Sequence, residues 1–180
     1  MALHPVVCAA QLTKEVSNQI LRYPDVVIAQ IKWQVMDRFI VNSGSKEGWW
    51  ECVFVDSISH CYDEISETPV ESDSDPNSPF IGKTPEECHR LLLKLHEDTG
   101  SEITTDFFMI MDEKSIQDDT VLLVSVTGEE DEQTGIRDLL TLRATFEVSA
   151  KELMLYSIGH WTIEEDAERA VEQGDSVSRG

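Results

Sequence analysis

The chain has 180 residues, of which 41% are apolar, and its 35 acidic against 14 basic side chains give a net charge of −21. This length and composition favour one folded domain over residues 1–180, with a full hydrophobic core. So negative a surface repels phosphate backbones and anionic lipid headgroups, which argues against direct binding to nucleic acid or to a membrane. A basic protein partner or a cation is favoured instead, although the same charge could serve solubility alone.

The start of the chain and the cysteines bear on its compartment. Residues 1–15, MALHPVVCAAQLTKE, contain a short apolar run with no basic residue before it, so no secretory signal is expected. No apolar run reaches the roughly 20 residues of a membrane span, and we expect a cytoplasmic protein. Cys52 and Cys88 fall in apolar segments and are expected to be buried free thiols, because the cysteines form neither a C-x-x-C pair nor a zinc-binding array.

The first patterned segment is Pro24–Gly44. Its apolar side chains recur at helical spacing, and Asp25 can cap the start of a helix that ends at Gly44. The alternation from Val27 to Val35 also permits a strand, but the helix accounts for the whole segment. We predict this helix, with a short strand at Ile20–Tyr23 before it.

The next two segments differ in composition. Trp49–Asp56, WWECVFVD, is bulky and β-branched, and it predicts a strand that is buried on both faces and stops at Asp56. Residues 63–82 contain three prolines, four serines and several acids, with no basic side chain. This composition predicts a mobile acidic insertion that a basic partner could order.

The segment KTPEECHRLLLKLHEDTG predicts a helix with clear ends. Thr84 is an N-cap, Glu87 completes a capping box with it, and Gly100 ends the helix. His89 and His96 lie off the apolar stripe, so both are expected to be solvated.

The segment FFMIMDEKSIQDDTVLLVSV predicts two strands, Phe107–Met111 and Val121–Val126. The nine residues 112–120 are too few for a parallel return, so the two strands should be antiparallel neighbours. Asp118 and Asp119 are expected to be turn and edge residues.

The rest of the chain predicts one more strand and two helices. Gly128–Gly135 is an acidic turn, and Leu139–Val148 predicts the strand. Ser149 and Thr162 are each followed three residues later by glutamate, so each is expected to cap a helix. Residues 175–180 are predicted to be a frayed tail.

Strands and helices alternate in the first part of the chain, which favours parallel pairing there. With the antiparallel pair that follows, the sequence predicts an α/β (α+β mixed) fold. Its mixed, partly parallel central sheet has about five strands and is flanked by three to four helices.

This sheet predicts one candidate site. If the strands that end at Asp56 and Asp112 run side by side in the same direction, both carboxylates emerge at one edge, with His60 four residues past Asp56. Asp56, His60 and Asp112 are the candidate catalytic residues, and Asp56, Asp112 and Glu113 are the candidate metal ligands. Aspartate also ends strands simply by capping turns, so a turn-forming role is the competing interpretation. No cofactor is expected, with a divalent cation as the alternative.

Other catalytic signatures are missing from the sequence. It contains no glycine-rich phosphate loop, no G-x-S-x-G elbow and no H-E-x-x-H motif. An enzyme is therefore less favoured than a protein without catalysis.

Several motifs carry a family resemblance: a strand ending in Asp, a helix opened by Thr with Glu-Glu, the runs FFMIMDEKSI and TVLLVSV, and the closing stretch LRATFEVSAKELMLYSIGHWTIEEDAERAV. Together they resemble an uncharacterised family of small acidic microbial α/β proteins, catalogued as a domain of unknown function. The resemblance covers Ile20–Gly180, and residues 63–82 depart from the compact bacterial forms. Because these motifs serve packing, the resemblance implies a mixed α/β domain and transfers no catalytic residue.

Charge and motifs together lead to two hypotheses. The first is a non-catalytic acidic interaction protein that binds or masks a basic protein partner, such as a nuclease-like toxin or a nucleic-acid-binding protein. The alternative is a small accessory enzyme or ligand-binding domain of a metabolic pathway, with a carboxylate site at the strand ends.

Overall fold

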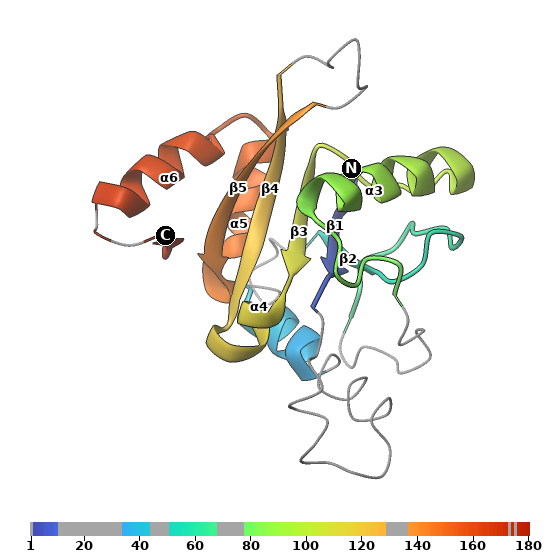
Figure 1. Ribbon diagram of the computed structural model, residues 1–180, viewed down its shortest axis with the longest axis horizontal. Coiled ribbons are helices and arrows are strands. Elements are labelled where there is room, and N and C mark those ends of the chain that lie inside the picture. Colours follow the sequence, from blue (N-terminus) through green and yellow to red (C-terminus); the bar gives the residue numbers. More distant parts are fainter. Residues whose placement is uncertain are drawn as a thin grey trace.

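The computed structural model describes residues 2–10, 34–43, 51–67, 78–128, 137–172, 174 and 176–180. Its centre is a six-stranded mixed sheet with the strand order β2-β1-β3-β4-β5-β6 (Figure 1). The strands are β1 (His4–Cys8), β2 (Cys52–Val55), β3 (Phe107–Met111), β4 (Thr120–Thr127), β5 (Asp138–Thr145) and β6 (Val177–Ser178). β1 pairs in parallel with β2 and β3, β4 is antiparallel to both of its neighbours, and β6 is parallel to β5. The predicted α/β class is confirmed, with six strands where about five were expected.

β1, at the centre of the parallel part of the sheet, is a strand that the sequence did not predict. All five of its residues are buried, with Val6 in the hydrophobic cluster on one face of the sheet and Val7 in the cluster on the other. A strand covered on both faces shows no polar alternation, so HPVVC looks like any short apolar run. β2 and β3 do run in the same direction, but the prediction that they lie side by side is wrong, because β1 separates them.

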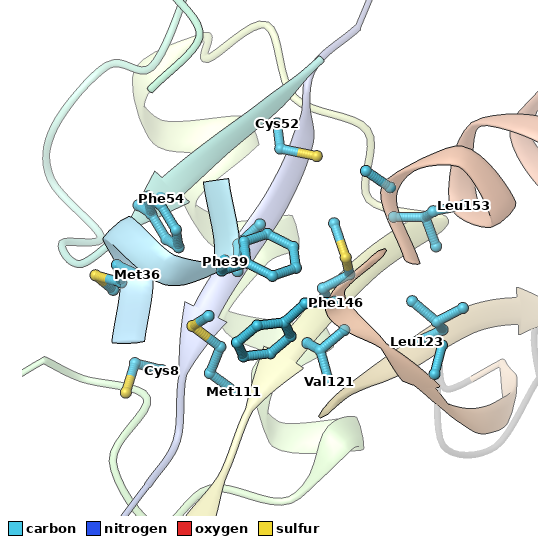
Figure 2. Close-up of a cluster of buried hydrophobic side chains, with 14 of the residues drawn as sticks. Cys8, Met36, Phe39, Cys52, Phe54, Met111, Val121, Leu123, Phe146 and Leu153 are labelled. Carbon is cyan, nitrogen blue, oxygen red and sulfur yellow. The ribbon is translucent and has the colours of Figure 1, made fainter. Parts of the chain in front are cut away.

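Helices cover both faces of the sheet (Figure 1). The labelled helices are α3 (Pro85–Thr99), α4 (Glu113–Asp118), α5 (Phe146–Ser157) and α6 (Ile163–Glu172). α3 packs on one face, while α5 and a helical segment at 34–42 pack on the other. On that second face Phe39 meets Phe146 edge-on, with ring centroids 5.0 Å apart (Figure 2). Within the described part of the chain, no helix is both long and apolar enough to cross a bilayer.

Several predicted segments are described only in part, and residues 129–135 of the predicted acidic turn Gly128–Gly135 lie outside the described residues. Residues 34–42 of the predicted helix Pro24–Gly44 are helical, whereas the rest of it before 34 and the predicted strand Ile20–Tyr23 lie outside the described residues. In the predicted insertion 63–82, residues 68–77 lie outside them as well. At one end of the insertion the Ser66 amide donates to the Cys52 carbonyl over 3.0 Å, and at the other Phe80 is fully buried. Mobility therefore stays a prediction for the central residues alone.

The capping signals of α3 are confirmed. Thr84 accepts from the Glu87 amide, the Glu87 carboxylate accepts from the Thr84 amide, and Gly100 takes a left-handed conformation at φ 68°. The expectation that His89 is solvated is wrong, because this residue is only 5% exposed and its ring stacks on that of Phe108. His96 is exposed, as expected.

The connection between β3 and β4 is a short helix, α4, rather than the turn expected from the sequence. Asp112 is its N-cap and accepts from the amides of Lys114 and Ser115. Asp119 ends it in a left-handed conformation at φ 55°, which aspartate tolerates better than most residues. The predicted antiparallel pairing of the two strands is confirmed.

The predicted start of α5 is wrong. The helix begins at Phe146 directly after β5, with Thr145 as its N-cap residue. Ser149, the expected cap, lies inside the helix, where its hydroxyl donates to the Phe146 carbonyl over 3.1 Å. The Glu152 carboxylate does not reach back to Ser149, because it accepts from the Ser178 hydroxyl instead, at 2.6 Å.

The end of the chain contains one predicted feature and one short strand that was not predicted. Thr162 and Glu165 form the predicted reciprocal cap of α6. The tail predicted to be frayed instead contributes β6, in which Ser178 pairs with Ala144. The contact between Ser178 and Glu152 fixes this edge strand to α5 as well.

Candidate functional site

Asp56 and His60 meet around the ring of Tyr62. The Tyr62 hydroxyl donates to Asp56 Oδ1 over 2.7 Å and accepts from the amides of Asp56 and Ser57 at 3.1 and 3.0 Å. The exposed His60 ring lies edge-on to the Tyr62 ring, with centroids 4.8 Å apart. Burial, followed by the hydrogen bond to Asp56, raises the pKa of Tyr62 well above its usual value. These contacts close the loop after β2, which is the turn-forming role of Asp56.

Asp112 has different partners. Besides capping α4, its carboxylate forms a bidentate ion pair with the Arg143 guanidinium. Arg143 Nη1 lies 3.2 Å from Asp112 Oδ1. Arg143 Nη1 also donates to the Thr120 hydroxyl over 3.0 Å. Glu113 is exposed in the first turn of α4. Asp112 thus ties the end of β3 to β5.

The structure does not bring Asp56 and Asp112 together into the predicted strand-end site. Asp56 and Asp112 follow β2 and β3 at the same edge of the sheet, but β1 lies between these strands. Adjacent strands are about 4.8 Å apart, so the two strand axes are roughly 10 Å apart. Among the described residues, no group of three or more His, Cys, Asp or Glu side chains has a geometry that could hold a metal ion. Each carboxylate also has its own hydrogen-bond or ion-pair partner.

A surface hollow lies at the same end of the molecule as these strand ends. We call it the acidic hollow; its volume is about 380 Å³, and it lies between the 34–42 helix, the end of α4 and the start of α5. It is lined by Val41, Asn42, Asp118, Asp119, Thr145, Phe146 and Glu147. Asp118 and Asp119, which the sequence predicts as turn and edge residues, line this hollow, and no local sequence signal places Glu147 beside them.

Among the described residues, negative charge exceeds positive charge around the acidic hollow. Three of its lining side chains are carboxylates, and Arg38 lies beside them, with its Nη2 2.8 Å from Asp119 Oδ1. Asp118 accepts from the Thr120 hydroxyl over 2.6 Å, which fixes its carboxylate at the end of α4. Val41 is 52% exposed and supplies an apolar wall. The hollow therefore combines negative charge with an accessible aliphatic surface.

No protein-family model, curated protein or solved structure matches this chain. The resemblance to the family of small acidic microbial proteins accordingly stays a prediction.

Proposed function

We propose that this protein is a non-catalytic acidic interaction protein that binds a basic protein partner through the acidic hollow. The observation that carries the proposal is the grouping of Asp118, Asp119 and Glu147 around one hollow beside an exposed Val41. A lysine or arginine side chain suits such a place, because its charged end can meet the carboxylates while its methylene stem packs on an apolar wall. The net charge of −21 would also speed the approach of a basic partner.

The alternative, an enzyme or ligand-binding domain with a carboxylate site at the strand ends, has less support. Asp56 and Asp112 are each held by a separate partner, Tyr62 and Arg143. A cytoplasmic location is part of the proposal, since the buried thiols of Cys52 and Cys88 suit a reducing compartment.

The test compares two triple variants that lose the same charge. One carries Asp118→Asn, Asp119→Asn and Glu147→Gln, and the other carries Glu164→Gln, Glu168→Gln and Glu172→Gln on the exposed face of α6. Binding of a fluorescent deca-lysine peptide is measured at two salt concentrations. We expect the hollow variant to weaken binding about tenfold or more and the α6 variant about twofold, with wild-type binding weakening as salt rises. Equal losses in both variants, or binding indifferent to salt, would contradict the proposal.

A further inference from the structure

A second hollow lies along α3, at the opposite end of β3 from the acidic hollow. We call it the α3 hollow; its volume is about 570 Å³, within the range of small-molecule pockets. One wall is the helix face that carries His89, Leu93, His96 and Glu97. The facing wall includes Asp106 and Arg137, at the starts of β3 and β5. Since no residue lines both hollows, the two can be tested independently.

His89 is an unusual residue in the wall of this hollow. Its ring stacks on that of Phe108, with centroids 6.1 Å apart and planes at 10°, and its Nε2 atom is buried with no hydrogen-bond partner among the described residues. Burial lowers the pKa of His89, so the ring is neutral near pH 7. A buried imidazole nitrogen without a partner costs free energy that a phenyl ring would not. Local rules of this kind are broken most often where a residue has a function.

His96 presents a defined hydrogen-bond acceptor. Its Nδ1 atom lies 2.9 Å from the carbonyl oxygen of Ser101. Because a carbonyl oxygen only accepts, Nδ1 carries the hydrogen, and Nε2 of the neutral ring then has an available lone pair. This nitrogen can accept a hydrogen bond from a ligand that enters the hollow.

The charged groups of the α3 hollow are only partly paired. Arg137 and Asp106 form an ion pair at 3.4 Å with both side chains about half exposed. Glu97, also exposed, has no ion-pair partner among the described residues. Between the two histidines along the helix, Leu93 is 42% exposed. The hollow thus offers acceptors and one unpaired negative charge around an aliphatic surface.

We propose that the α3 hollow binds a small aliphatic amine. Its ammonium group would donate to the Glu97 carboxylate and to Nε2 of His96, and its methylene chain would pack on Leu93. The net charge of −21 raises the local concentration of organic cations. A carboxylate ligand fits less well, because Arg137 is already engaged by Asp106.

Isothermal titration calorimetry at physiological ionic strength tests the proposal, with putrescine, cadaverine and spermidine as probes and glutarate as the anionic comparison. We expect at least one amine to bind with a Kd below about 1 mM. Glu97→Gln should weaken that binding about tenfold, because a charge-assisted hydrogen bond is lost. Asp98→Asn, on the next residue of α3, which is also exposed, should change it about twofold at most.

A second pair of variants tests the hollow without changing a carboxylate. Leu93→Trp should fill it and abolish amine binding, while Lys94→Trp, at an exposed position that does not line it, should leave binding intact. Binding by no amine, tighter binding of glutarate, or equal effects of Glu97→Gln and Asp98→Asn would each overturn the proposal. Any of these results would leave the acidic hollow and its peptide assay unaffected.

Discussion

Arg143 on β5 binds both carboxylate oxygens of Asp112, a residue 31 positions earlier that also caps α4. The Arg143 side chain is only 12% exposed, so the ion pair is shielded from water. The same guanidinium reaches Thr120 at the start of β4. Asp112 therefore joins three elements, which explains its place after β3 without a catalytic role.

This relationship predicts a large stability loss for Asp112→Ala. The change removes a helix cap and leaves a mostly buried guanidinium without its counter-charge, so the free energy of unfolding should fall by about 3 kcal/mol. Asp112→Asn keeps an acceptor for the cap, so its loss of unfolding free energy should be smaller than that of Asp112→Ala. Urea denaturation measures both, with Gln117→Ala at an exposed position of α4 as the control. A loss from Asp112→Ala no larger than that of the control would show that the ion pair contributes little.

The elements that sequence predicted correctly are those with local signals. Thr84 with Glu87 and Thr162 with Glu165 form the expected caps because neither partner is buried, so each glutamate can turn back on the helix end. The pair Ser149 and Glu152 has the same spacing and fails. Burial against β6 draws the Glu152 side chain to Ser178, so tertiary packing overrides the local motif.

The strand-end site and the α3 hollow were harder to predict, since each depends on which segments are neighbours in the fold. The unpredicted strand β1 lies between β2 and β3. Its five residues are all buried and show no alternation of apolar and polar side chains, so the sequence does not indicate a strand there. His89 and His96 did carry a signal: seven positions apart on a helix, they share one flank of the apolar stripe. What faced that flank, Asp106 and Arg137, could be known only from the folded sheet.

The buried carboxyl of Glu152 predicts a pH-dependent stability. Burial raises its pKa to about 7, while the Ser178 hydroxyl opposes that rise. Because the folded pKa lies above the unfolded one, the contribution of this group to stability is full below about pH 4.5 and is lost as the pH rises through 7. Glu152→Gln removes the titration. The difference in unfolding free energy between variant and wild type should therefore grow by about 2 kcal/mol from pH 5.5 to pH 8, in favour of the variant.

Chemical denaturation at the two pH values checks this expectation. Glu164→Gln, at an exposed position of α6, serves as the control and should show almost no change between them. If the difference in unfolding free energy between Glu152→Gln and wild type does not change with pH, the pKa of the Glu152 carboxyl is the same in the folded and unfolded states.

Ser178→Ala tests whether β6 is held by its side chain. Without the hydroxyl, the Glu152 carboxylate loses its hydrogen-bond donor, so the pKa of Glu152 should rise further. The variant should lose about 1 kcal/mol or more of unfolding free energy at pH 8, where the carboxylate is charged, and less at pH 5.5. Denaturation at both pH values provides the readout, and the same Ser178→Ala change made in Glu152→Gln, whose side chain stays uncharged, provides the comparison. Equal losses at the two pH values would show that the hydroxyl does not stabilise the charged form.

His89→Phe should stabilise the protein. The phenyl ring preserves the stacking on Phe108 and removes a buried nitrogen that lacks a partner, so the free energy of unfolding should rise by about 1 kcal/mol at pH 7.5. The gain should increase as the pH falls below about 6.5, because burial lowers the pKa of His89 and the wild type loses stability when the unfolded chain takes up a proton. Denaturation at pH 7.5 and 5.5 measures both effects. His96→Phe, in which an exposed ring loses its hydrogen bond to Ser101, is the control and should give no such gain. If His89→Phe instead destabilises the protein, Nε2 of His89 has a hydrogen-bond partner in solution.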